Sequence, residues 1–263
     1  MESTPTKVRA SASRGHGVRA RSAPQRLCII PSVLLLVFSL AVSTTTRPAP
    51  LDDGKAALDR GDFDKALNIL RPLAEAGDAD AQEQLFRMYV EGKGVPESRE
   101  RGFDWLQKAA SQGRAEDQYM VGVMYRTGTG VPKDEAMAAS WFLKAADQGN
   151  ADAQDNLGAL YRYGAGVPKD FGLGFKWTLK AAKQNDARAQ LNLSRLYYLG
   201  EGVQNDLVQS YAWLSMAIAN ASNHDPDVGP TAIRIRDGLT PSLSQEQLSQ
   251  ARKLLTEWSS SRH

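Results

Sequence analysis

The feature that most constrains the fold of this chain is one sequence motif that recurs every 36 residues. It reads YVEGKGVPES from Tyr89, YRTGTGVPKD from Tyr125, YRYGAGVPKD from Tyr161 and, more loosely, YYLGEGVQND from Tyr197. Glutamines and tryptophans outside this motif recur with the same spacing, namely Gln82, Gln118, Gln154, Gln190, Trp105, Trp141, Trp177 and Trp213. Self-similarity at a fixed period of this length indicates an array of stacked supersecondary units.

Each unit contains two predicted helices. In the third unit the first helix spans about residues 151–163, because Ala153, Leu157, Leu160 and Tyr161 fall on one helical face. The first glycine of the G-x-G-V loop, Gly164 in this unit, suits the left-handed residue that ends a helix. The second helix carries the tryptophan and an Ala-Ala pair on its buried side, and it ends at a Gly or Asn.

The helix starts also follow the repeat. Side chains that favour the N-cap precede most of the helices, and they are Asp78, Asn150 and Asp186 for the first helices and Ser98, Asp134, Asp170 and Asp206 for the second. Arg114 breaks the first series. Gly122 and Gly158 recur inside the first helix, where a glycine is unfavourable, so we expect another helix to approach closely there.

These patterns predict an all-α fold, an α-solenoid of stacked antiparallel helix pairs. The repeat resembles that of the SEL-1-like repeat (SLR) family, a branch of the tetratricopeptide superfamily, and its consensus is AxAQxxLGxLYxxGxGVPKDxxxAxxWxxKAAxQG. On this reading the units are residues 79–114, 115–150, 151–186 and 187–222. Residues 51–78 and 223–263 are expected to form capping helices, the last of them capped by Ser244.

The N-terminal segment has a different composition. Residues 1–26 are basic and 27–43 contain an uncharged apolar run, a pattern typical of a secretory signal peptide cleaved after Ser43. An uncleaved membrane anchor and a mitochondrial presequence are alternatives, and residues 44–50 are expected to be a linker. We therefore expect export, to the periplasm or anchored through residues 27–43, with no other contact with a membrane.

Charge and residue usage exclude several functions. Residues 51–263 hold 25 basic and 29 acidic groups and no basic cluster, which argues against nucleic acid as a partner. The only cysteine, Cys28, lies before them, and His224 has no second histidine nearby. The G-x-G loops follow helices, unlike nucleotide-binding loops. We expect no catalytic residues, no metal and no cofactor, and we expect the tryptophans to pack in the core rather than bind sugar.

Variable positions of the first helix are the candidates for binding, because that helix lines the concave side of such arrays. Asparagines one unit apart can hold the backbone of an extended peptide, and arginines can hold a carboxylate or an acidic sugar. The candidate groove residues are Gln84, Met120, Arg126, Asn156, Arg162, Tyr163, Asn192 and Tyr198.

The expected function is that of an exported, non-catalytic adaptor. The resemblance implies a groove that binds a protein or peptide and a role in scaffolding or regulating envelope complexes. A cell-wall glycan or exopolysaccharide is an alternative ligand. β-Lactam hydrolysis is a third possibility, but the proteins credited with it carry paired cysteines in each repeat, which residues 51–263 lack.

Overall fold

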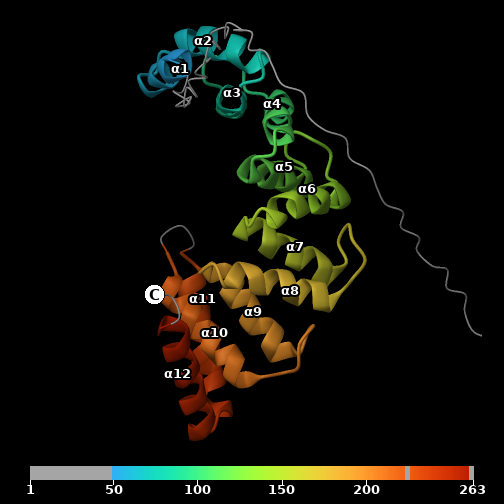
Figure 1. Ribbon diagram of the computed structural model, residues 1–263, viewed down its shortest axis with the longest axis vertical. Helices are drawn as coiled ribbons and strands as arrows, with labels where there is room; N and C mark the ends of the chain where they lie inside the picture. Colours follow the sequence, from blue (N-terminus) through green and yellow to red (C-terminus); the bar gives the residue numbers. More distant parts are fainter. Residues whose placement is uncertain (1–48, 223–225, 261–263) are drawn as a thin grey trace, which may run out of the picture. The chain divides into compact units, whose positions relative to one another are not determined.

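The computed structural model describes residues 49–222 and 226–260, and this part of the chain is helical without a strand (Figure 1). The predictions for residues 1–48 and for His224 lie outside the described residues. Ala49 and Pro50, which the sequence predicts to end the linker, already belong to the first helix. The helices are α1 (Ala49–Asp59), α2 (Phe63–Glu75), α3 (Ala79–Glu91), α4 (Arg99–Ser111), α5 (Ala115–Thr127), α6 (Glu135–Asp147), α7 (Ala151–Tyr163), α8 (Phe171–Ala182), α9 (Ala187–Leu199), α10 (Leu207–Asn220), α11 (Val228–Leu239), η1 (Thr240–Ser242) and α12 (Gln245–Ser260).

The helices pair in chain order, which confirms the predicted solenoid. The first helices of the four units are α3, α5, α7 and α9, here called the A helices, and the second helices are α4, α6, α8 and α10, the B helices. Each A helix packs on the B helix of its own unit. The A helices α5, α7 and α9 also pack on the B helix of the unit before, and α3 packs on α2 in the same way. Figure 1 shows this succession from α3 to α10. Each pair thus completes its core only through a neighbour.

The helix ends form as the sequence predicts. In the third unit the Asn150 side chain accepts a hydrogen bond from the Ala153 N–H at 2.7 Å, and Asp170 accepts one from the Leu173 N–H at 2.8 Å. Gly164 closes α7 with φ 70°, a left-handed conformation. The other predicted caps make the same bond, whereas Arg114 does not.

The second glycine of each G-x-G loop joins neighbouring units. A Cβ added at Gly166 would lie 2.2 Å from the carbonyl carbon of Glu135, at the start of the preceding B helix. Gly130 and Gly202 approach Arg99 and Phe171 in the same way. The loop therefore needs glycine for a close backbone contact between units as well as for its positive φ.

A ladder of buried glutamines also connects the units. The Gln154 side chain is 4% exposed, donates to the Ala146 carbonyl at 3.0 Å and accepts from the Gln184 amide at 2.9 Å. Gln82, Gln118 and Gln190 repeat both bonds with the corresponding residues. The glutamine thus ties its A helix to the C-terminal ends of two successive B helices.

The tryptophans pack inward, as predicted. Trp141, Trp177 and Trp213 are buried and Trp105 is half-buried. The Gly122 and Gly158 predictions are confirmed too, because an added Cβ would lie 2.6 Å from Phe142 and 2.4 Å from Thr178.

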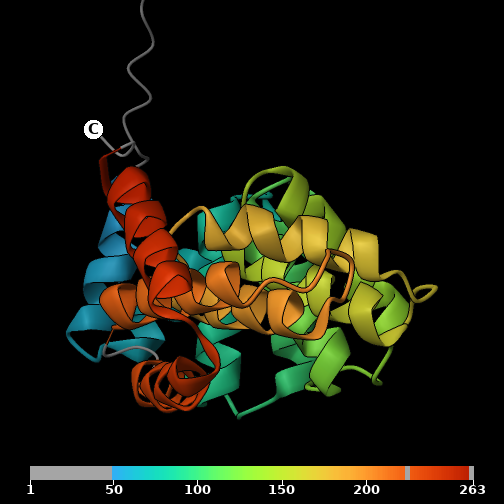
Figure 2. The same ribbon diagram turned by 90° about the horizontal axis from the view of Figure 1, so that it is seen from below.

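Helices beyond the repeats cover both ends of the array. On the N-terminal side α1 and α2 form one more pair that packs on α3. Asp62 falls on the N-cap register of the second helices, but it makes no side-chain cap bond to α2. On the C-terminal side α12 lies beside α10, as Figure 2 shows, and Ser244 caps it reciprocally with Gln247. Among residues 49–222 and 226–260, no helix is long and apolar enough to cross a membrane.

Candidate functional site

Three of the predicted groove residues meet at one place on the A helices. A small pocket of about 100 Å³ lies between the third and fourth units, and Arg162, Tyr163 and Asn192 line it. Asp155 and Arg195 of the same A helices also line it, and Thr178 of α8 is the remaining polar residue. We call the five A-helix residues the polar cluster. Their helices, α7 and α9, both pack on α8, which explains how positions more than a full repeat apart in sequence come together.

Asp155 is the buried anchor of the polar cluster. Its side chain accepts two hydrogen bonds from the Asn192 amide, at 3.1 Å to Oδ1 and 2.8 Å to Oδ2. Burial raises the pKa of Asp155 to about 6, and the Asn192 bonds oppose that rise. Asn192 therefore has a structural role, because it satisfies a carboxylate that is only 8% exposed.

Arg162 of the cluster already interacts with other residues of the chain. Arg162 forms an ion pair with Glu201 through its Nε, and its Nη1 donates to the Tyr163 hydroxyl at 3.0 Å. Tyr163 is nevertheless 63% exposed, and Arg195 is exposed. Tyr163 and Arg195 are thus the members of the cluster that are most accessible to a partner.

The remaining predicted groove residues lie elsewhere on the array. Arg126 donates to Asn156 across the second and third units, and Met120 packs against the core between the first and second units. Gln84 lines a separate pocket with Arg87 in the first unit. Tyr198 lies at a third pocket, beside Ile235 of α11.

Sequence reasoning missed Asp155 and Arg195. In the other units the position of Asp155 holds Glu83, Tyr119 and Leu191, and the position of Arg195 holds Arg87, Val123 and Ala159. The variability that signals a binding position was therefore visible at both positions. The sequence did not show that Asp155 is buried and bonded to Asn192. Asn156 and Asn192, which we predict to hold a peptide backbone, each already make a hydrogen bond within the array.

The polar cluster has the chemistry of a recognition site. It offers a guanidinium, a phenol and a carboxylate held by an amide, which together can bind an extended backbone or an acidic side chain. Within the part of the chain that the structure describes, no three His, Cys, Asp or Glu side chains gather closely enough to hold a metal ion.

Stacked helix pairs with a polar site on their A helices define an α-solenoid of the repeat-scaffold class. The Sel1 repeat model matches residues 79–113, 115–150, 151–186 and 187–222, so the chain belongs to the Sel1 repeat family. These matches cover the four predicted units. Sel1 repeat proteins are typically protein-interaction scaffolds.

Two solved structures show the same fold. One is a Sel1 repeat protein from Oxalobacter formigenes, 28% identical with a TM-score of 0.60, covering 65% of this chain and 71% of that one. The other is c5321, a protective antigen of uropathogenic Escherichia coli with an SLR fold, 35% identical with a TM-score of 0.67. It covers 80% of this chain, which spans 44% of the antigen. A comparison with curated protein sequences gives no match.

Proposed function

We propose that this protein is a non-catalytic adaptor that binds an extended segment of another protein on its A helices, with the polar cluster as the centre of the site. The A-helix surface is the expected concave groove. The observation that carries the proposal is the convergence of Arg162, Tyr163 and Asn192 from two units on one pocket. Core packing alone does not require an exposed tyrosine and an exposed arginine at its mouth.

The chemistry of the cluster favours a segment that carries an acidic side chain. Arg195 can pair with a carboxylate of the partner, and Tyr163 offers a ring face and a hydroxyl. Asp155 is buried and hydrogen-bonded to Asn192, so its carboxylate is not presented to the partner. The leader composition supports an exported chain, so we place the adaptor in the cell envelope, periplasmic or anchored through residues 27–43.

The test is crosslinking at single positions of the exported full-length chain. A photoreactive residue replaces Tyr163 in one variant and exposed Arg234 of α11 in a control. We expect a discrete protein adduct at position 163 that is absent at 234, and we expect Arg195→Ala to reduce it. Asn192→Ala is a poor probe, because it removes the partner of buried Asp155.

Three results would contradict the adaptor proposal. The first is the same set of adducts at positions 163 and 234. The second is retention of the protein on purified glycan without any protein adduct at 163, which would favour the alternative ligand. The third is turnover of a chromogenic β-lactam, which would make the chain an enzyme.

A further inference from the structure

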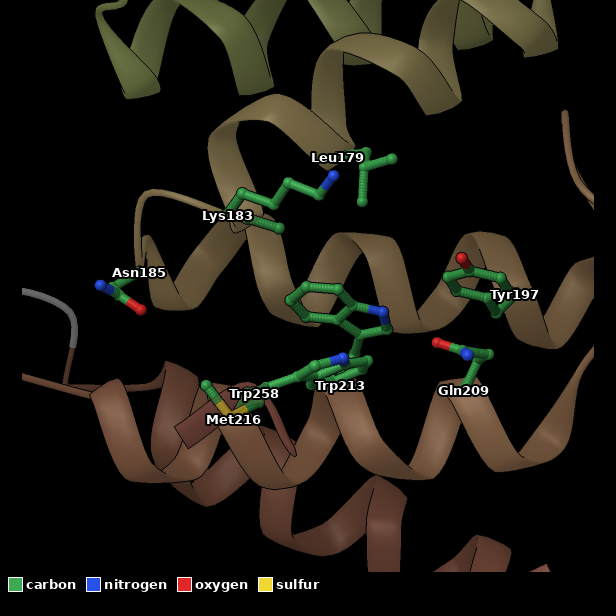
Figure 3. A pocket seen from close by; sticks show the side chains of 9 residues that line it. Leu179, Lys183, Asn185, Tyr197, Gln209, Trp213, Met216 and Trp258 are labelled. Atoms are coloured by element: carbon green, nitrogen blue, oxygen red, sulfur yellow. The ribbon is translucent and has the colours of Figure 1, made fainter. Parts of the chain in front are cut away.

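A larger pocket than that of the polar cluster lies between α8, α9, α10 and α12, and the two share no residue. Its volume is about 510 Å³, within the range of sites that hold small ligands. Figure 3 shows its lining, with Lys183 and Asn185 toward one end and Tyr197 and Gln209 toward the other. The lining residues are Leu179, Ala182, Lys183, Asn185, Tyr197, Gln209, Trp213, Met216 and Trp258.

The floor of this pocket departs from the repeat. In the first three units a lysine three positions after the tryptophan lies over its ring, with Nζ 4.0, 3.8 and 3.9 Å from the centroid. In the fourth unit this register holds Met216, and α12 supplies Trp258, whose ring centroid lies 4.4 Å from that of Trp213. A thioether and a second indole replace the ammonium, so the floor becomes apolar and aromatic.

One buried polar atom in this floor has no partner. The indole N–H of Trp213 is buried and makes no hydrogen bond, and the Trp213 side chain is 7% exposed. Buried indole N–H groups usually find an acceptor. The Trp213 N–H is shielded from solvent, so the floor of the pocket is less completely satisfied than an ordinary packed core, and the ring of Trp213 rather than its N–H faces a bound molecule.

The rim departs from the repeat as well. Asn185 has φ 68° at a register where the earlier units have Gly113 and Gly149, so an amide stands where they have no side chain. A left-handed backbone favours glycine, and asparagine tolerates it at some cost. Burial and the charge of Asp206 raise the pKa of Tyr197, so its hydroxyl stays protonated and can donate.

Charge and polarity together select the ligand. Lys183 is the only charged group among the nine lining residues, so the pocket favours an anion. Five of these side chains are apolar or tryptophan, and no carboxylate is present to accept bonds from sugar hydroxyls. We propose that this pocket binds the C-terminal end of a peptide, with a large apolar side chain on the indoles, the terminal carboxylate at Lys183 and the backbone at Asn185 and Gln209.

The experiment titrates the full-length chain with acetyl-Gly-Gly-Phe and with its C-terminal amide, read by tryptophan fluorescence and calorimetry. We expect saturable binding of the free acid and an affinity for the amide that is lower by about fivefold, the effect of one exposed charge pair. Asn185→Gly restores the glycine of the other units and relieves the left-handed backbone. It should therefore weaken binding while the stability is maintained or increased.

Two further variants test the charge and the aromatic floor. Lys183→Gln should abolish the preference for the free acid, whereas Lys176→Gln, an exposed lysine of α8 outside the pocket, should leave it intact. Trp258→Phe should keep the fold and weaken binding. In Trp258→Phe the fluorescence change and the calorimetric heat should weaken together, because both report the same binding event.

The proposal is overturned by any of three results. One is no saturable binding of the free acid at about 10 mM, a concentration that detects even millimolar affinity. Another is binding that Asn185→Gly and Lys183→Gln leave unchanged. The third is binding of an acidic oligosaccharide, instead of the peptide, that depends on these same residues. None of these results bears on the polar cluster of α7 and α9.

Discussion

Replacing Gln154 with methionine tests whether the glutamine ladder stabilises the array. Gln154 is 4% exposed and makes two bonds, to the Ala146 carbonyl and from the Gln184 amide. Methionine keeps an unbranched side chain of similar volume, so the substitution removes the bonds with little change in packing. Any loss of stability can therefore be assigned to the hydrogen bonds.

The expected magnitude follows from what each partner loses. The Ala146 carbonyl still accepts from the Gly149 N–H at 3.0 Å, so it is not left without a partner. The Gln184 amide is exposed and can turn to water at little cost. What remains is one buried hydrogen bond and an imperfectly solvated carbonyl, together about 1–2 kcal/mol of unfolding free energy.

The assay is urea unfolding followed by circular dichroism, with Gln184→Met as the matched control. Gln184→Met removes only the bond from the exposed amide and leaves the Gln154 Oε1 without that donor, so it should cost about 1 kcal/mol or less, and less than Gln154→Met. The double variant should lose no more than Gln154→Met alone. Equal losses for the two single variants, or a neutral Gln154→Met, would refute the assignment of stability to the buried end of the ladder.

Three further predictions concern single sites. Gly166→Ala should destabilise the chain by about 2–5 kcal/mol, because its Cβ meets Glu135, whereas Gly149→Ala, with φ 94° and open space, should cost about 1–2 kcal/mol in the same unfolding assay. Ser244→Ala should cost about 1 kcal/mol through the lost cap of α12, read by hydrogen exchange in that helix, and Ser249→Ala should leave the exchange unchanged. Burial raises the pKa of Asp117 from 3.8 to about 6. Protonation of Asp117 therefore stabilises the folded chain below about pH 4, and this contribution is lost as the pH rises through about 6. Asp117→Ala should stabilise the chain near pH 7 and give a smaller gain near pH 4, measured by unfolding at the two pH values.

The Asp117 prediction depends on a pair of departures from the repeat. Asp117 occupies the register of Ala81, Ala153 and Ala189, and its carboxylate is fully buried beside Arg114, whose Nε lies 3.0 Å from Oδ2. Neither carboxylate oxygen has a hydrogen bond of good geometry. Arg114 also reaches Asp80 and Glu83 at 2.6 Å. The residue that breaks the N-cap series therefore forms an inter-unit ion cluster instead.

Much of the fold could be predicted because its determinants are local. Gly164 ends α7 and Asp170 begins α8 through contacts within four residues, and such contacts depend on residue type and spacing alone. Repetition strengthened the inference, since each signal appeared in several units. The Trp177 side chain was correctly placed in the core for the same reason.

The candidate site was predicted only in part. The variable registers identified Arg162, Tyr163 and Asn192, and all three line one pocket. The same registers gave no sign that the Asn192 amide donates to Asp155, because this hydrogen bond joins residues that are 37 positions apart and on different helices. Sequence variability marks a position as free from the constraints of the fold, but the partner of a side chain depends on rotamers and neighbours.

By itself the sequence determined the helix pairs, their boundaries and the solenoid, because capping, glycine conformation and helical periodicity act over a few residues and repeat every 36. Only the tertiary structure decided where side chains from different units meet. The glutamine ladder, the polar cluster and the contact between the Trp213 and Trp258 rings all join residues about a full repeat or more apart. Their contacts depend on how each pair docks on the next, and that geometry is not encoded in any single unit.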